Sequence, residues 1–258
     1  MSAIENLLSL SGKTALISGA SSGLGAHFAK VMAQAGAHVI IAARRADKLA
    51  ELVEQITAEG GKAQALSMDV TSANSVNAAF TQLDGMIGSL DILVNNAGIS
   101  TAPTKFTELE EEDWSYLLDV NLKGAWRVGK QAAIRMKAGG KGSIINTGSI
   151  YSLCTGMQKA DYNVSKVAVG QLTKNMALEL SRSGIRVNSL CPGYFASAIN
   201  EGEFNSERGK AYIARLVPQR LGQYHELTGP LLLLASDAGS YINGSSLVVD
   251  GGSLLSPI

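Results

Sequence analysis

The chain has 258 residues, of which 46% are hydrophobic and 17% charged, and it contains 28 glycines but only 5 prolines. This composition supports a buried core and excludes a disordered or low-complexity chain. Lys and Arg together number 22, as do Asp and Glu, and no basic run is present, so no nucleic-acid partner is expected.

Short apolar runs alternate with amphipathic segments along almost the whole chain. The predicted elements are, in order, strand 14–19, helix 24–36 with Gly36 as its C-cap, strand 37–43, helix 47–59, strands 63–70 and 90–98, helix 111–137, strand 142–149, helix 160–183, strand 185–193, helix 224–236 and strand 246–252. Apolar strands that alternate with helices are typical of a parallel sheet buried on both faces. We therefore expect an α/β protein with a doubly wound, Rossmann-type parallel sheet of about seven strands and helices on both faces.

The pattern indicates a single dinucleotide-binding and catalytic domain over residues 1–258, because no linker or internal repeat interrupts it. Only the stretch 194–223 is polar and irregular. Connections at the carboxyl ends of strands carry the site in such folds, so this stretch is expected to be a substrate-loop insertion.

The cysteines and the N-terminus bear on compartment and cofactor class. Cys154 and Cys191 form neither a disulfide framework nor a metal-binding motif, so no metal is expected. The N-terminus lacks the features of a secretory signal, and apolar runs such as 231–235 are too short to span a bilayer. The expected setting is the cytoplasm, without a membrane partner.

The glycine-rich segment SGASSGLG, residues 18–25, connects the first strand to the first helix. Its glycines Gly19, Gly23 and Gly25 permit a tight turn and close approach of a ligand, and the helix N-terminus behind them offers N–H groups to a pyrophosphate. The GxxxGxG spacing departs from the GxGxxG fingerprint, and such a turn can be purely structural. Its position after the first strand favours dinucleotide binding by this loop, which also contains Ser21, Ser22 and Leu24.

The end of the second strand indicates which dinucleotide binds. Sites for NAD place an acid there to bind the ribose 2′-OH, whereas sites for NADP supply a cation for the 2′-phosphate. Here Ala43 holds the acid position and Arg44 and Arg45 follow, which favours NADP(H). Arg44 is the preferred phosphate ligand, Arg45 is either a ligand or a solvated charge, and Asp47 is expected to be a helix N-cap.

The segment DYNVSK, residues 161–166, places a tyrosine and a lysine one helical turn apart. A free tyrosine has a pKa of about 10, which is too high for a base near neutrality. A neighbouring ammonium favours the phenolate, so Lys166 is expected to lower the pKa of Tyr162. Taken alone, this spacing also fits a polar helix face.

Several motifs occur together and in order: SGASSGLG, NNAG at 95–98, Asn121, Ser149, YNVSK and CPG at 191–193. In this the chain resembles the short-chain dehydrogenase/reductase family, in its compact single-domain branch, from about Gly12 to Gly252. The resemblance implies a catalytic tetrad of Asn121, Ser149, Tyr162 and Lys166. Tyr162 would be the general acid or base, Ser149 would hydrogen-bond the substrate oxygen, Lys166 would hold the nicotinamide ribose, and Asn121 would support a proton-relay water.

The same resemblance implies further cofactor contacts besides Tyr162 and Lys166. These are Asp69 and Val70 beside the adenine, Asn95, Ala97 and Gly98 along the cofactor, and Pro192, Gly193, Phe195 and Ser197 on the nicotinamide side. A structural role is an open alternative for Asp69 and Val70, and also for Asn95, Ala97 and Gly98. Ser18 and Ser22 depart from the family pattern, since Thr often stands at the first position and a basic residue often stands at the second in NADP-preferring members.

The substrate is expected to contact Ser149, Tyr151 and Tyr194, in a partly apolar pocket that suits a ketone or keto ester better than a polar sugar. The resemblance is greatest to bacterial 3-oxoacyl-thioester reductases and ketoreductases. The alternatives are an NAD-dependent sugar or polyol dehydrogenase, an epimerase or dehydratase, and a dinucleotide sensor without activity. Enoyl reductases space their Tyr and Lys more widely. A homotetramer is expected from the family, through the long central helices and the C-terminal region.

Overall fold

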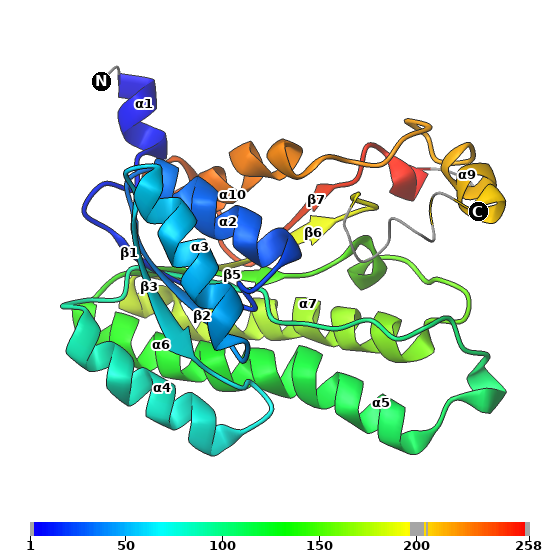
Figure 1. Cartoon of the computed structure of the whole chain (residues 1–258), viewed down its shortest axis with the longest axis horizontal. Coiled ribbons are helices and arrows are strands. Elements are labelled where there is room, and N and C mark those ends of the chain that lie inside the picture. The colour runs from blue at the N-terminus through cyan, green and yellow to red at the C-terminus, as the bar shows by residue number, and fades with distance from the viewer. Residues whose placement is uncertain (1–2, 197–203, 205, 256–258) are drawn as a thin grey trace.

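Seven parallel strands form one sheet in the computed structural model, which describes residues 3–196, 204 and 206–255 (Figure 1). The strands are β1 Thr14–Ser18, β2 His38–Ala43, β3 Lys62–Ser67, β4 Ile92–Asn95, β5 Gly142–Thr147, β6 Ile185–Pro192 and β7 Ser246–Val249. Their order is β3-β2-β1-β4-β5-β6-β7. The predicted fold class is therefore confirmed.

Helices cover both faces of this sheet, as the layers in Figure 1 show. The α-helices of the described residues are α1 Ala3–Leu8, α2 Gly23–Gln34, α3 Ala46–Ala58, α4 Ala73–Met86, α5 Glu111–Leu118, α6 Ala125–Gly139, α7 Ala160–Leu180, α9 Glu207–Ile213 and α10 Thr228–Ala235. One hydrophobic core joins the sheet to α2, α3 and α10, and a second joins it to α4, α6 and α7. No helix in the described part of the chain is long and apolar enough to cross a membrane.

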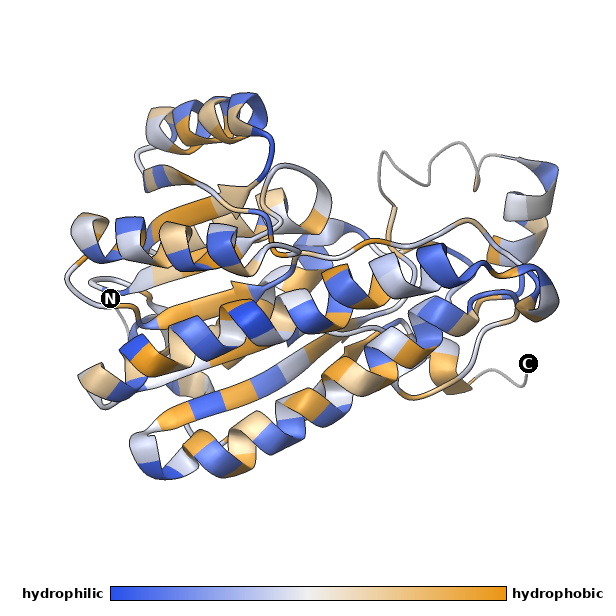
Figure 2. Ribbon diagram, turned by 90° about the horizontal axis from the view of Figure 1, so that it is seen from below, coloured by the Kyte–Doolittle hydropathy of each residue, from blue (hydrophilic) through white to orange (hydrophobic). Residues whose placement is uncertain are grey.

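Strands β1 and β2 are buried on both faces because most of their residues are apolar. In β1, Ala15 and Ile17 point into the first core and Leu16 into the second. The same two-residue alternation places Ile41 and Ile40 of β2 in opposite cores. Figure 2 shows the resulting pattern, with hydrophobic strands inside and hydrophilic outer surfaces on the helices.

Four expectations about local structure differ from the observed elements. Helix α4 was not predicted, although Ser72 caps it by accepting a hydrogen bond from Ser75 N at 3.2 Å. Helix α9 lies within the stretch expected to be irregular. The predicted helix 111–137 is interrupted by a π-helical turn over Asp119–Gly124, labelled η2. Asp47 is not an N-cap, because α3 begins at Ala46 with Arg45 as its cap; Asp47 lies in the first turn, where its charge still suits the helix dipole.

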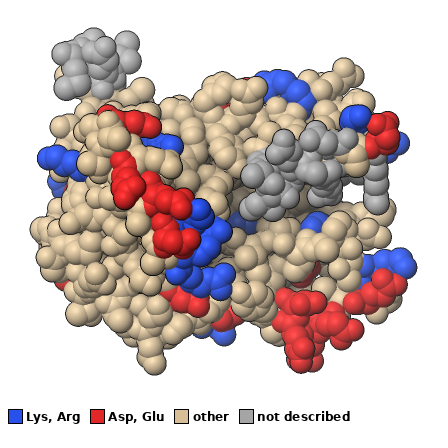
Figure 3. Space-filling view, viewed as in Figure 1, with Lys and Arg blue, Asp and Glu red and all other residues tan. Residues whose placement is uncertain are grey.

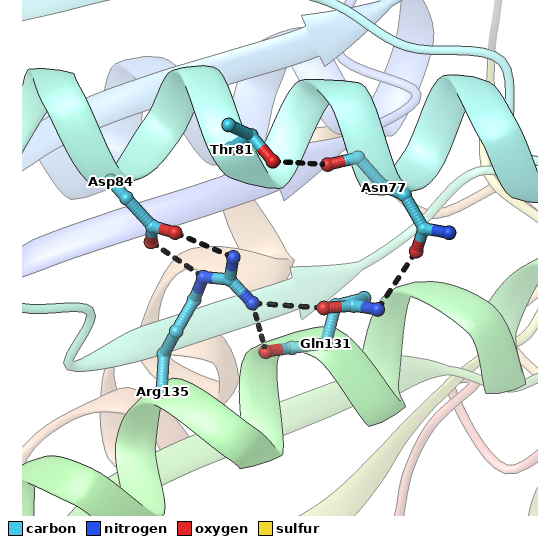
Figure 4. Close-up of polar contacts among 5 residues, drawn as sticks. All are labelled: Asn77, Thr81, Asp84, Gln131 and Arg135. Carbon is cyan, nitrogen blue, oxygen red and sulfur yellow. Dashed lines mark hydrogen bonds and ion pairs between the residues drawn. The ribbon is translucent and has the colours of Figure 1, made fainter.

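Polar contacts join α4 to α6 on the outer surface, as Figure 4 shows. Arg135 forms a two-point ion pair with Asp84, through Nε at 2.6 Å and Nη2 at 2.7 Å. Gln131 Nε2 donates to Asn77 Oδ1 at 2.9 Å. Since Asp84 is 54% exposed, these contacts fix the helix register more than they stabilise the fold.

The strand order reverses between β1 and β4, which lie side by side although α2, β2, α3, β3 and α4 separate them in the chain. Ligands of doubly wound sheets bind outside the carboxyl ends of the strands at such a switch point. A ligand site is therefore expected at the switch point between β1 and β4.

Charged side chains of both signs are scattered over the face shown in Figure 3. The acidic group at the start of α5 consists of Glu110, Glu111, Glu112 and Asp113.

Candidate active site

The glycine loop lies at the carboxyl end of β1, and its three glycines meet different requirements. A Cβ at Gly19, which has φ +67°, would lie 2.7 Å from Ala97 Cα, and one at Gly25 would overlap the Gly19 carbonyl oxygen. Gly23 also has a positive φ, of +58°, but its nearest neighbour is the Tyr224 hydroxyl at 3.7 Å. Gly19 and Gly25 thus allow the loop to pack, while Gly23 leaves room for a ligand.

The start of α2 behind this loop offers uncapped backbone N–H groups. Its N-cap residue is Ser22, whose side chain makes no capping hydrogen bond, and no acidic residue occupies the first turn. An anion such as a pyrophosphate suits such a helix end, because its partial positive charge is not neutralised from within.

The ends of β1 and β4 are tied together by side chains of the NNAG motif. Ser18 Oγ accepts hydrogen bonds from the backbone N–H groups of Asn96 and Ala97, both at 3.0 Å. Asn96 Nδ2 in turn donates to the carbonyl oxygens of Ser18 at 3.2 Å and Gly19 at 3.3 Å. Asn96, which was not among the predicted site residues, therefore holds the glycine loop in place.

Asn95 was predicted to contact the cofactor, but its side chain lies in the interior. It is 5% exposed and donates to the Ala125 carbonyl at 2.7 Å and to Asn146 Oδ1 at 3.2 Å. Its amide therefore links β4, β5 and α6, and a contact of Asn95 with the cofactor stays a prediction.

Arg45 lies against the glycine loop. Its Nη2 donates to Ser21 Oγ at 2.8 Å and to Ser22 Oγ at 2.9 Å. Arg44 is exposed, and in the part of the chain that the structure describes its guanidinium has no hydrogen bond or ion pair. One arginine thus braces the loop and the other is open to a ligand.

The pair after β3 is also engaged internally. The Asp69 carboxylate accepts hydrogen bonds from Thr71 N at 2.9 Å and Thr71 Oγ1 at 2.8 Å. Val70 is 8% exposed and packs where a Cβ at Gly124 would come within 2.9 Å of it. Both residues lie at the carboxyl edge of the sheet, as expected, with their side chains largely committed to the turn and the core.

Tyr162, Ser149 and Lys166 converge at the carboxyl ends of β5 and β6. Tyr162 is half-buried in the first turn of α7, and Ser149, the cap of the short helix η3, Ile150–Ser152, lies close enough to its hydroxyl to affect the pKa of the phenol. Burial raises the pKa of Tyr162, while Ser149 partly opposes this shift. The expected lowering by Lys166 is therefore not the net direction, since burial is the largest cause of the shift.

Lys166 is 6% exposed and lies one turn after Tyr162, with its Nζ 5.5 Å from the centre of the tyrosine ring. The same Nζ donates to the Thr147 carbonyl at 2.8 Å. Burial lowers the pKa of Lys166 to about 8. A buried ammonium with few hydrogen-bond partners is costly, so burial brings the pKa of Lys166 closer to neutral pH.

Asn121 lies in the π-helical turn and faces the same site. Its Oδ1 accepts from Ile99 N at 2.8 Å, and its Nδ2 donates to the Ile99 carbonyl at 2.9 Å and to Ser165 Oγ at 3.1 Å. A Cβ at Gly98 would lie 3.3 Å from Asn121 Oδ1 and 3.8 Å from Lys166 Nζ. Gly98 therefore keeps open the space between these two side chains, and π-turns are frequent at functional sites.

The segment after β6 meets the site only in part. Gly193 N donates to the Val249 carbonyl at 2.9 Å, which joins the turn after Pro192 to β7. Phe195 is 8% exposed, with its ring against Gly222, so its side chain packs in the core and its contact with the cofactor stays a prediction. Ser197 lies outside the described residues. Tyr194 does reach the site, because its hydroxyl lies 2.7 Å from that of Tyr151.

The sequence and the fold of this chain resemble those of known proteins. The family model described as enoyl-(acyl carrier protein) reductase matches residues 19–253. Gluconate 5-dehydrogenase from Gluconobacter oxydans is 38% identical over 249 residues, which cover 96% of each chain. The chain belongs to the short-chain dehydrogenase/reductase family.

Two other proteins show the range of this short-chain dehydrogenase/reductase family. The 3β-hydroxysteroid dehydrogenase 1 of Eggerthella lenta is 38% identical over 253 residues, covering 96% of each chain. A solved structure of gluconate 5-dehydrogenase from Burkholderia cenocepacia J2315, in complex with NADP and tartrate, has a TM-score of 0.94 at 37% identity and covers 99% of this chain and 100% of that chain. The family predicted from the sequence is confirmed, and the protein is an oxidoreductase of the short-chain type.

Proposed function

We propose that this oxidoreductase transfers a hydride between NADP(H) and a ketone or secondary alcohol, with Tyr162 as the proton donor or acceptor. The observation that carries the proposal is the placement of Ser149 and the buried Lys166 beside Tyr162, with the lysine Nζ 5.5 Å from the centre of the tyrosine ring. NADP(H) supplies the hydride when bound, so the chain has to bind, orient and move a proton. A sensor without activity has no use for a paired hydroxyl and phenol at this position.

The protonation state of Tyr162 suits carbonyl reduction. Because its pKa is raised by burial, the phenol keeps its proton at neutral pH and can give it to a carbonyl oxygen. Ser149 lies beside the phenol and would orient the substrate oxygen. Lys166 and Asn121 flank the opening at Gly98, where they would position the nicotinamide ribose and a relay water.

The residues around the glycine loop fit NADP(H). Gly23 leaves space before an uncapped helix end, which suits the pyrophosphate. Ala43 offers no carboxylate to a ribose 2′-OH, and Arg44 presents an exposed guanidinium that suits a 2′-phosphate. The NADP in the related Burkholderia structure supports this choice.

The relatives leave two substrate classes open. One is named for gluconate and one for a hydroxysteroid, yet both are 38% identical to this chain. Sequence identity therefore does not decide between a sugar acid and a steroid-like alcohol. The description of the family model as an enoyl reductase does not extend to this site, because Tyr162 and Lys166 have the four-residue spacing rather than the wider one of enoyl reductases.

Association into a homotetramer, part of this proposal, is supported by apolar side chains left exposed on adjacent helices. These are Tyr116 on α5, Trp126 and Ile134 on α6, and Val164, Val167 and Leu178 on α7. Light scattering at micromolar concentration should give four times the monomer mass, and Val167→Glu should lower it. A monomer in the unmodified protein would contradict the assembly without affecting the proposed chemistry.

The test of the activity is oxidation of NADPH and of NADH at 340 nm against a panel of aryl ketones, keto esters, 5-keto-D-gluconate, a 3-ketosteroid and acetoacetyl thioesters. We expect turnover of at least one ketone with NADPH. Tight NADPH binding with no turnover by the unmodified protein would favour a sensor, and faster turnover with NADH would remove the argument from Arg44.

A further inference from the structure

The wall of the site beyond Tyr162 begins with a tyrosine that is held by a second tyrosine. Tyr151 in η3 stands edge-on to Tyr162, with ring centroids 6.0 Å apart and planes at 89°. Its hydroxyl lies 2.7 Å from that of Tyr194, which follows β6, and these two rings are perpendicular as well. Tyr194, on the segment after β6, therefore holds the Tyr151 ring in place beside Tyr162.

The contacts continue to α9. The Tyr194 ring meets Tyr212 of α9 at a centroid distance of 5.2 Å and an angle of 77°. Phe204 packs on Tyr194 at 6.4 Å. Tyr151, Tyr194 and Tyr212, called the tyrosine wall below, therefore form a continuous aromatic surface from Tyr162 to α9.

The hydroxyls of the tyrosine wall offer a ligand few donors. Each phenol has one O–H donor, and the Tyr151–Tyr194 link consumes one of the three. Burial raises the pKa of all three phenols, so they remain protonated donors well above neutral pH. The wall can offer a ligand at most two free donors, and the rest of its surface is ring carbon.

Such a wall treats two kinds of ketone differently. A polyhydroxy chain placed against it gives up hydrogen bonds with water for which few partners are supplied. A cyclic carbon skeleton loses no such bonds and buries its C–H surface against the rings. The chemistry of the wall therefore favours carbon-rich ring systems.

We propose that the tyrosine wall determines specificity, selecting ketones carried on a ring or fused-ring carbon skeleton over open-chain polyhydroxy ketones. The proposal rests on the proposed function, since it concerns the same site. Tyr194 is its central residue because it contacts both Tyr151 and Tyr212. Removal of the Tyr194 hydroxyl releases the Tyr151 hydroxyl beside Tyr162 and loosens the surface of the wall.

The experiment compares kcat/KM with NADPH for trans-1-decalone, a fused bicyclic ketone, and for 5-keto-D-gluconate. The unmodified protein should prefer the decalone. In Tyr194→Phe, KM for the decalone should rise about three- to tenfold, as expected for loss of a hydrogen bond, with kcat within about twofold. The preference ratio should fall about tenfold. Tyr241→Phe is the matched control, because Tyr241 is fully exposed and outside the site.

A preference for 5-keto-D-gluconate in the unmodified protein overturns the proposal, as does an unchanged ratio in Tyr194→Phe when circular dichroism shows that the variant is folded. Should no ketone turn over, the proposed function fails but the wall is still tested by binding. Calorimetric titration of trans-1-decalone should then give about three- to tenfold weaker binding in Tyr162→Phe/Tyr194→Phe than in Tyr162→Phe. Equal affinities would refute the wall on its own.

Discussion

Lys166 lies one helical turn from Tyr162, with its ammonium 5.5 Å from the centre of the tyrosine ring. The pair was predicted from the four-residue spacing alone, but the structure adds that Lys166 points on to the Thr147 carbonyl. Burial acts on both members: it raises the pKa of Tyr162 and lowers that of Lys166 to about 8. Tyr162 therefore keeps its proton at physiological pH, whereas Lys166 is still mostly protonated there and loses its charge as the pH rises through about 8.

Loss of the Tyr162 hydroxyl should abolish the proposed chemistry while sparing cofactor binding. Tyr162→Phe removes the proton donor but keeps the ring against Tyr151. Positioned acid–base groups contribute about 100- to 10,000-fold to a rate, so kcat should fall within or beyond this range. Stopped-flow measurement of NADPH oxidation and a fluorescence titration of NADPH would separate the two effects.

The control for this variant is Tyr241→Phe, since Tyr241 is fully exposed. Its kcat should equal that of the unmodified protein. Residual activity above a tenth in Tyr162→Phe would assign the proton transfer to another group.

The lowered pKa of Lys166 should appear in the stability of the protein. In the unfolded chain this lysine titrates near 10.5, and in the folded chain near 8. Between these values the unfolded state binds the extra proton, so the contribution of Lys166 to the free energy of unfolding rises with pH across that window. The full difference corresponds to about 3 kcal/mol.

The measurement is the difference in unfolding free energy between the unmodified protein and Lys166→Met, from urea titrations at pH 7, 8, 9 and 10. At pH 7 the variant should be the more stable, and the gap should narrow as the pH rises. A gap that stays constant would mean that Lys166 keeps its proton in the fold.

Parts of the site could be predicted from the sequence because they require one residue type at a fixed spacing. Gly23 needs a positive φ, and Tyr162 and Lys166 need a single helical turn between them. The π-turn at Asn121 could not be predicted, because the bonds from Asn121 to Ile99 span 22 positions of the chain. The role of Asn96 was missed for a similar reason, since its partners lie on β1.

Helix α4 and the arginine pair show two other limits. The buried face of α4 includes Val76, Ala79, Phe80 and Leu83, but Asn, Ser, Thr and Gly residues elsewhere in the same helix lower the helix propensity of the segment. For Arg44 and Arg45, the sequence gives the charges but not which guanidinium turns inward onto Ser21 and Ser22. That choice depends on the packing of the loop.

The two arginines should therefore have separable effects on cofactor binding. Arg44→Ala removes the exposed guanidinium and should weaken NADPH binding about 10- to 100-fold, the range for a hydrogen bond to a charged group, with little change for NADH. Arg45→Ala releases Ser21 and Ser22 from their brace and should weaken both dinucleotides, since the loop is common to them. Isothermal titrations of both variants with both dinucleotides test this.

The reverse pattern, with Arg45→Ala selective for NADPH and Arg44→Ala without effect, would assign the 2′-phosphate to Arg45. Equal losses for NADPH and NADH in both variants would leave the 2′-phosphate without an arginine ligand and remove the structural basis for NADP preference.

Two glycines in helices offer a matched test of the packing beneath the cofactor loop. A Cβ at Gly25 of α2 would overlap the Gly19 carbonyl oxygen, so Gly25→Ala should cost about 1–3 kcal/mol of stability and impair dinucleotide binding. Gly85 of α4 has no atom within 4 Å of its Cβ position, so Gly85→Ala should be neutral or stabilise by up to about 1 kcal/mol. Thermal unfolding and NADPH titration of both variants test this prediction. Equal stability of Gly25→Ala and Gly85→Ala would show that the glycine loop can move aside at little cost, and that α2 does not hold the loop rigidly against β1.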